Sequence, residues 1–167
     1  QYLGDGILIL FGYPQAHENE AEGAVRAGLS LLEEIQKLHV VLEKEFSKRI
    51  AARIGIHTGE VMIRQEGGDS GNIFGETPNL AARVQAAAAP DSVCISAATQ
   101  RLVAGFFVVD DLGPHILKGF PDPIQLFKVE RPSGVRSRLH AAAVNSLTPF
   151  MGREDERNLL MSRWAQV

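Results

Sequence analysis

The chain has 167 residues, of which 45% are hydrophobic and 22% are charged, and its formal net charge is −3. This length and composition predict one globular domain plus a fragment of another. The slightly negative charge, without a run of Lys and Arg, argues against a nucleic-acid partner. The sequence has no signal-peptide pattern and no apolar run of roughly 18 residues, so we expect a cytoplasmic protein without a membrane segment in this chain.

Cys94 is the single cysteine, so an intrachain disulfide is excluded. It lies in the apolar run 92–95, which favours a small buried side chain over a reactive thiol. A single cysteine also fits a reducing compartment such as the cytoplasm.

The chain opens with a turn at Gly4-Asp5-Gly6, followed by the continuous apolar run 7–11. Such a run predicts a strand that is covered on both faces. A long helix is predicted from about residue 18 to residue 38 or further, because apolar residues recur there at helical spacing. We interpret this helix as scaffold. Since native domains rarely begin inside a sheet, we expect further residues ahead of Gln1.

The middle of the chain alternates strands with helices, which is typical of an α/β or α+β domain. A second helix is predicted after Gly75, with Thr77 as its cap, Pro78 in its first turn and its end at Pro90-Asp91. The remaining predicted elements are strands at 53–57 and 60–64, a loop at 65–71, a strand at 92–96, a short helix at 97–103, and strands at 106–111, 113–118 and 124–129.

The composition changes after Val129. We divide the chain into a domain at 1–129, a linker at 130–146, and the start of a further unit at 147–167. This last unit is predicted to be helical up to Trp164.

Two groups of polar residues could carry chemistry. Asp5 is a carboxylate on a tight turn, a ligand that Mg²⁺ accepts together with substrate phosphates, although such turns are often purely structural. Asn79 and Arg83 share one face near the start of the second helix, where anions are favoured. Arg83 could bind phosphoryl oxygens through two hydrogen bonds, and a solvated polar face is the alternative.

Two further residues are weaker candidates. Lys118 precedes a glycine at a predicted strand end and could contact a phosphate, although most such lysines extend into water. His57 also follows a strand, and a structural role is the more common one for a lone histidine. The histidines show no metal-ligand spacing, and no P-loop motif is present.

The order of these motifs is more specific than any one of them. The chain carries Gly4-Asp5-Gly6, Ile54-Gly55-Ile56-His57-Thr58-Gly59, the block Gly75 to Arg83, and Leu117-Lys118-Gly119. This series resembles the class III adenylyl and guanylyl cyclase catalytic domain over about residues 1–129. The block G-x-T-x-N-x-A-A-R is the most specific part of the resemblance.

The resemblance implies an α+β fold, a ferredoxin-like sandwich in which helices pack on a mixed sheet. It implies an adenylate cyclase that converts ATP to cyclic AMP and pyrophosphate for intracellular signalling. The site would form between the two chains of a homodimer, one supplying the metal carboxylates and the other the asparagine and arginine. A monomer is therefore expected to be inactive.

The resemblance also implies residue roles. Asp5 matches the second of two aspartates that hold two Mg²⁺ or Mn²⁺ ions in the complete domain. Asn79 matches the residue that orients the ribose, Arg83 matches the one that stabilises the pentavalent phosphorus, and Lys118 is expected to bind substrate.

Two departures from the family pattern concern the site. The first metal-binding aspartate would precede Gln1, so this chain alone is expected to be inactive. The purine-reading positions correspond to Gln1 and, approximately, Asn72. Their amides both donate and accept hydrogen bonds, so they could read adenine without excluding guanine.

Residues 147–154 resemble the entry to an AAA-type or related P-loop ATPase module, which cyclases of the soluble type often carry downstream. Two alternatives to an adenylate cyclase stay open. One is a non-catalytic cyclase-homology domain that regulates an attached ATPase, and the other is a guanylate cyclase. The block at 75–83 argues against the related diguanylate cyclases.

Overall fold

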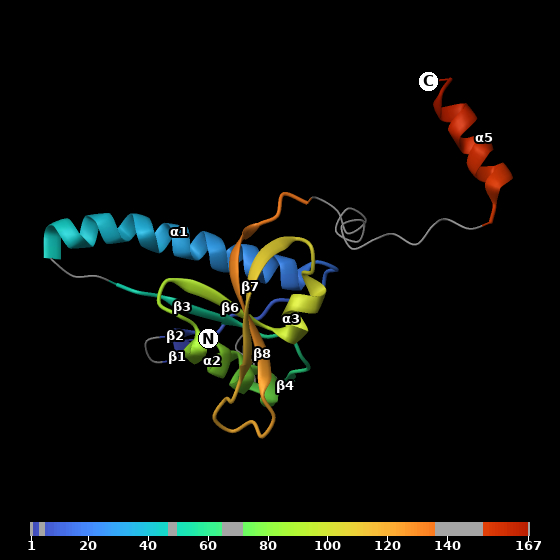
Figure 1. Cartoon of the computed structure of the whole chain (residues 1–167). Coiled ribbons are helices and arrows are strands. Elements are labelled where there is room, and N and C mark those ends of the chain that lie inside the picture. The colour runs from blue at the N-terminus through green and yellow to red at the C-terminus, as the bar shows by residue number, and fades with distance from the viewer. Residues whose placement is uncertain (1, 4–5, 47–49, 65–71, 136–151, 167) are drawn as a thin grey trace.

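The structure is a computed structural model that describes residues 2–3, 6–46, 50–64, 72–135 and 152–166 (Figure 1). The strands are β1 Tyr2–Leu3, β2 Gly6–Ile7, β3 Arg53–Ile56, β4 Met62–Arg64, β5 Asn72–Phe74, β6 Ser92–Ser96, β7 Phe107–His115 and β8 Ile124–Pro132. The helices are α1 Glu20–Phe46, α2 Glu76–Ala87, α3 Ala97–Leu102 and α5 Glu154–Trp164.

A four-stranded mixed sheet forms the centre of the domain, in the order β3-β6-β8-β7. Strands β3 and β6 are parallel, whereas β8 is antiparallel to both of its neighbours. The parallel pair requires a long crossover, which includes α2. Two further strand pairs, β1-β2 and β4-β5, are antiparallel. This architecture confirms the predicted α+β class with a mixed sheet and packed helices.

Helices α1 and α2 cover opposite faces of the sheet because the side chains of β6 alternate between the two faces. Val93 packs with Val25 of α1 in one core cluster. Cys94, the next residue, packs with Val84 of α2 in the other cluster. Figure 1 shows the long α1 lying across its face of the sheet, as expected for a scaffold helix.

The prediction for Cys94 is confirmed, since its side chain is 1% exposed. Burial raises the pKa of the Cys94 thiol to about 11. The thiol is therefore protonated at neutral pH and contributes to the core as a small apolar group.

The prediction of a strand at 7–11 covered on both faces was wrong for the described chain. Strand β2 ends at Ile7, and the Ile7 and Ile9 side chains are 65% and 61% exposed. The run alternates between half-buried and exposed residues up to Phe11. The physical reason is that the Ile7 and Ile9 side chains lie on a side of this segment that no other described element covers.

The strands predicted at 106–111 and 113–118 form one strand, β7, which ends at His115. An irregularity in its pairing with β8 between Asp111 and Gly113 lets the strand continue through the glycine. Strand β8 extends to Pro132, so the structured domain continues past the predicted boundary at Val129. The loop predicted at 65–71 and most of the predicted linker lie outside the described residues.

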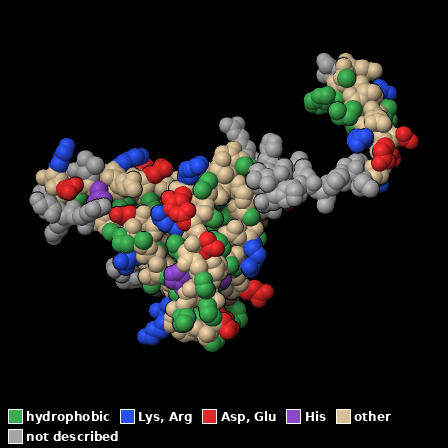
Figure 2. All heavy atoms as spheres, in the orientation of Figure 1, with side chains coloured by type: hydrophobic (Ala, Val, Ile, Leu, Met, Phe, Trp, Pro, Cys, Tyr) green, Lys and Arg blue, Asp and Glu red, His purple; other side chains and the backbone are tan. Residues whose placement is uncertain are grey.

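The predicted C-terminal helix is present as α5, and its described residues are exposed. Among the described residues, no helix combines the length and apolar character that crossing a membrane requires. On the face of the domain shown in Figure 2, Lys and Arg side chains alternate with Asp and Glu side chains.

Candidate active site

Helix α2 presents Asn79 and Arg83 to the solvent. Its opposite face carries Leu80 and Val84, which are 9% and 0% exposed and anchor the helix in the core. Both candidate residues are exposed, and their spacing of four places them on one side of the helix. The side chains are therefore available to a ligand that approaches from outside the chain.

The two side chains differ in their partners. The amide nitrogen Nδ2 of Asn79 donates a hydrogen bond of 3.2 Å to the carbonyl oxygen of Gly75. The Arg83 guanidinium forms no hydrogen bond or ion pair with any described residue. A free, exposed guanidinium with five N–H donors suits a phosphate or another anion.

The predicted cap of α2 was wrong. The helix begins at Glu76 with Gly75 in the cap position, where φ is 129° and a residue without Cβ is favoured. Thr77 lies inside the helix, and its hydroxyl donates a 2.5 Å hydrogen bond to the carbonyl oxygen of Glu60. Because the helix starts two residues earlier than predicted, the Thr77 hydroxyl connects α2 to the segment after β3 and does not cap the helix.

His57 has the structural environment that the sequence favoured. Its Nδ1 lies 2.7 Å from the hydroxyl oxygen of Ser96, and the side chain is half-buried. Burial lowers the pKa of His57, because a charged imidazolium would lose its hydration. The ring is therefore neutral at pH 7 and acts as a hydrogen-bonding partner of Ser96.

Lys118 lies in the turn between β7 and β8, where its side chain is exposed. The preceding residue, Leu117, is 7% exposed and packs in the same core cluster as Leu80 and Val84 of α2. Lys118 therefore directly follows a residue that packs in the core beneath α2.

The side chains of the other three predicted site residues lie outside what the structure describes. Gln1 and Asp5 lie outside the described residues. Asn72 begins β5 and pairs in register with Arg64, and its side chain is not among those described. The structure thus brings together Asn79 and Arg83 on one side of α2.

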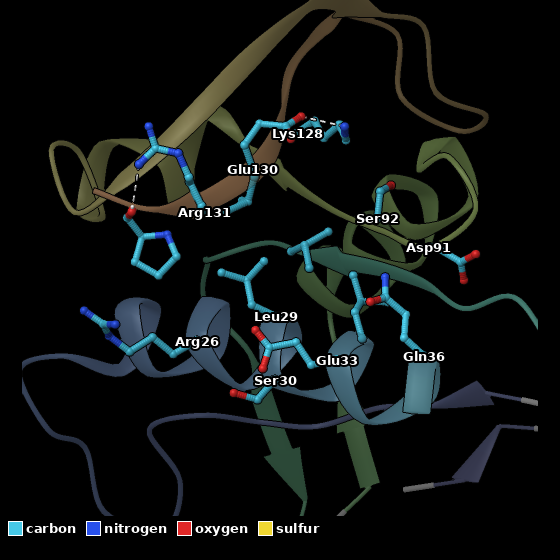
Figure 3. A pocket seen from close by; sticks show the side chains of 14 residues that line it. Arg26, Leu29, Ser30, Glu33, Gln36, Asp91, Ser92, Lys128, Glu130 and Arg131 are labelled. Atoms are coloured by element: carbon cyan, nitrogen blue, oxygen red, sulfur yellow. Dashed lines mark hydrogen bonds and ion pairs between the residues drawn. The ribbon is translucent and has the colours of Figure 1, made fainter. Parts of the chain in front are cut away.

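A hollow lies on the opposite side of the sheet, against α1. It is a groove of about 420 Å³, bordered by Arg26 and Glu33 of α1 and by Lys128, Glu130 and Arg131 of β8 (Figure 3). The charges are of both signs, and Lys128 and Glu130 form an ion pair of 2.5 Å. Of the predicted site residues that the structure describes, none lines this groove.

Residues 1–131 match the family model of the adenylate and guanylate cyclase catalytic domain. The chain belongs to this family. The match ends one residue before the last residue of β8, so it covers the structured domain and leaves α5 outside.

Cyclases are also found among relatives of this cyclase domain. An uncharacterized protein of Rhizobium meliloti is 28% identical over 98% of the chain, and the match spans 16% of that protein. A receptor-type adenylate cyclase of Trypanosoma congolense is 36% identical over 51% of the chain, a match spanning 12% of that protein. The chain thus spans a small part of the length of the curated relatives it matches.

Solved cyclase structures share the fold. The adenylyl cyclase CyaB of P. aeruginosa superposes with a TM-score of 0.72 at 27% identity, covering 83% of this chain and 71% of that one. The guanylyl cyclase Cya2 superposes with a TM-score of 0.70 at 24% identity, covering 80% and 70%. This cyclase domain therefore shares its fold with an adenylyl cyclase and with a guanylyl cyclase.

The predicted metal site of the cyclase domain rests on Asp5, which lies outside the described residues. Among the described residues, no cluster of three or more His, Cys, Asp or Glu side chains could hold a metal ion. The carboxylate of Asp5 is the donor type that Mg²⁺ and Mn²⁺ prefer. The two-ion site stays a prediction.

The structure also shows two contacts that the sequence did not predict. Thr77 belongs to the motif block, but its contact with Glu60 spans 17 residues of sequence. Gly55 lies against α2, where a Cβ atom would be 2.1 Å from the backbone nitrogen of Gln85. Neither contact has a local sequence signal, since each depends on how α2 folds back over β3.

Proposed function

We propose that this domain is an adenylate cyclase, which converts ATP to cyclic AMP and pyrophosphate in intracellular signalling. The observation that carries the proposal is the exposed pair Asn79 and Arg83 on α2, in a chain of the cyclase family. The similarity to the adenylyl cyclase CyaB and to a receptor-type adenylate cyclase supports ATP as the substrate. The proposed location is the cytoplasm.

The proposed reaction is the attack of the substrate's 3′-hydroxyl oxygen on its own α-phosphorus, with pyrophosphate as the leaving group. Arg83 would donate hydrogen bonds to phosphoryl oxygens and stabilise the charge that develops in the transition state. The Asn79 amide would hold the ribose so that the 3′-oxygen lies in line with the leaving group. Lys118, Gln1 and Asn72 are proposed to contact the nucleotide.

Asp5, with a second aspartate from the segment ahead of Gln1, would hold two Mg²⁺ or Mn²⁺ ions. When bound, such ions neutralise the phosphate charge and polarise the reacting oxygen atoms. Strand β3 is the edge of the central sheet in the described chain. We propose that the family's first strand, with this second aspartate, pairs with that free edge.

A homodimer is part of the proposal, because Asn79 and Arg83 are exposed and do not line the groove against α1 in the described chain. Met62 and Phe74 are paired across the β4-β5 hairpin and are 69% and 47% exposed. Strand β5 leads directly into α2, so this apolar pair lies close along the chain to the proposed site. Exposed apolar side chains beside a functional helix indicate an interface.

The test is cyclic AMP formation from ATP with Mn²⁺ by the protein that includes the segment ahead of Gln1. Arg83→Ala is expected to lower kcat by roughly 10²-fold or more, the scale seen when one transition-state donor is removed. Arg101→Ala is the matched control, because Arg101 is also an exposed helical arginine but lies on α3. Equal activity of the Arg83→Ala variant and the wild type would overturn the assigned role.

Two alternatives are decided by the same assay. Product from GTP exceeding product from ATP at equal concentration would establish a guanylate cyclase, which the similarity to Cya2 keeps in view. A folded, dimeric protein that forms no product from either nucleotide would favour a regulatory domain. That domain would control the ATPase module proposed to begin within residues 147–167, after a linker at 130–146.

A further inference from the structure

Hydrogen bonds on both sides hold the segment that follows β3, residues 57–60. On one side, His57 contacts the hydroxyl of Ser96 at 2.7 Å, and the hydroxyl oxygens of Thr58 and Thr99 are 3.0 Å apart. Ser96 and Thr99 are 1% and 0% exposed, so these contacts attach the segment to the rigid interior of the domain. Residues 57–60 are therefore held in place by contacts with buried residues.

On the other side, the same segment holds the start of α2. The Thr77 hydroxyl donates to the carbonyl oxygen of Glu60 at 2.5 Å. Thr77 lies two residues before Asn79 and less than two helical turns before Arg83. This hydrogen bond thus connects the first turn of α2, which carries Asn79 and precedes Arg83, to the segment at 57–60.

The backbone at Gly59 is shaped to receive Thr77. A Cβ atom at position 59 would lie 2.6 Å from the Thr77 hydroxyl oxygen and 3.2 Å from Nε2 of His57. A side chain at position 59 would push the threonine away or displace the histidine. Glycine therefore allows the close approach on which the Thr77 hydrogen bond depends.

We propose that Thr77 is a positioning residue that fixes α2 against residues 57–60 and so sets where Asn79 and Arg83 meet the nucleotide. This inference rests on the proposed function for its effect on activity. The physical reason is that displacing a transition-state donor by about 1 Å can cost about 10²-fold in rate. Thr77 itself is not proposed to touch the substrate.

The test compares Thr77→Val, which removes the hydroxyl, with Thr77→Ser, which keeps it. Both are measured in the protein with its segment ahead of Gln1. Ser133→Ala is the matched control, because the Ser133 hydroxyl donates a similar 2.6 Å hydrogen bond to the carbonyl oxygen of Gly105, far from α2 along the chain. Thr77→Val is expected to lower kcat by about 10- to 100-fold with a smaller change in KM. Thr77→Ser and Ser133→Ala are expected to keep most of kcat.

A second readout does not depend on activity. Hydrogen exchange of the backbone amides at 80–83 is expected to be faster in Thr77→Val than in the wild type, because the start of α2 would open more readily. In Thr77→Ser and Ser133→Ala, exchange at these amides is expected to match the wild type. If the wild type forms no cyclic nucleotide, the proposed function fails and this exchange measurement alone decides the positioning role.

The inference is overturned if Thr77→Val keeps the kcat of an active wild type. It is also overturned if Thr77→Val and Ser133→Ala lose kcat to the same extent, since this would indicate a general loss of stability. If the wild type is inactive, the inference is overturned when hydrogen exchange at 80–83 in Thr77→Val is the same as in the wild type.

Discussion

At the scale of single residues, exposure separates the residues that a ligand can reach from those that hold the fold. Arg83 is exposed and has no partner among the described residues, whereas His57 is half-buried against Ser96. Both were candidates on chemical grounds, since arginine binds phosphate and histidine transfers protons. The environment decides that only Arg83 is poised for an external anion.

The burial of His57 predicts a pH dependence of stability. Burial lowers the pKa of His57 below its ordinary value of 6.5. As the pH falls below 6.5, the unfolded chain binds a proton that the folded chain does not yet bind, so the free energy of unfolding decreases. The decrease ends once the pH is below the lowered pKa of the folded state.

His57→Gln, which keeps a hydrogen-bonding group for Ser96, is expected to weaken this acid sensitivity. Urea unfolding at pH 7.5, 6.5 and 5.5 measures the acid sensitivity of the free energy of unfolding. These pH values bracket the ordinary histidine pKa of about 6.5. The wild type is expected to lose more stability between pH 6.5 and pH 5.5 than the variant does. Equal losses in the two proteins would contradict the prediction.

At the scale of elements, the contact between α2 and β3 determines where the candidate site lies. The backbone of α2 at Gln85 rests directly on Gly55, so the helix approaches the strand more closely than any side chain would permit. Leu80 and Val84 complete the contact by filling the core below the helix. The position of Asn79 and Arg83 therefore follows from the packing of the opposite face of α2.

Gly55→Ala is expected to destabilise the domain by about 1–3 kcal/mol, the usual cost of forcing an extra group into a packed interior. Its Cβ atom would lie 2.1 Å from a backbone nitrogen, so α2 or β3 must move. Urea unfolding gives the change in the free energy of unfolding.

Gly23→Ala is the matched control for this substitution. A Cβ atom at position 23 of α1 would have its nearest neighbour at 4.0 Å, which is ordinary contact. Replacing a helical glycine by alanine is expected to stabilise the domain by about 0.5–1 kcal/mol. A neutral or stabilising effect of Gly55→Ala would show that α2 does not rest on β3 as described.

At the scale of the whole molecule, the proposed site is expected to need residues from two chains. Asn79 and Arg83 are exposed, and the groove of about 420 Å³ against α1 lies on the other side of the sheet. The exposed pair Met62 and Phe74 lies on the hairpin that leads into α2. A second copy of the domain bound at this hairpin would cover the Asn79 and Arg83 side chains, which are exposed in a single chain.

Met62→Glu is expected to weaken self-association by about tenfold or more, equivalent to about 1.4 kcal/mol, because a charge would be buried in an apolar interface. Leu38→Glu is the control, since Leu38 is also apolar and is 56% exposed, on α1. Sedimentation velocity over a range of concentrations compares both with the wild type. If the two variants dissociate equally, the hairpin has no special role in the dimer.

Much of the fold could be predicted because its signals are local. The helical spacing of apolar residues predicted α1 and α2, and the short apolar run at 92–96 predicted β6. The motif block predicted the family, which the match over residues 1–131 confirms. The prediction failed at 7–11, because an apolar run indicates burial only if another layer is present to cover it.

The sequence by itself determined the family and the pair Asn79 and Arg83, because motif order and helical spacing are properties of neighbouring residues. Only the tertiary structure decided that Thr77 contacts Glu60 and that Gly55 receives α2. It also decided that the groove against α1 lies away from Asn79 and Arg83. These features depend on packing between segments that are distant in sequence, and such packing has no local signal.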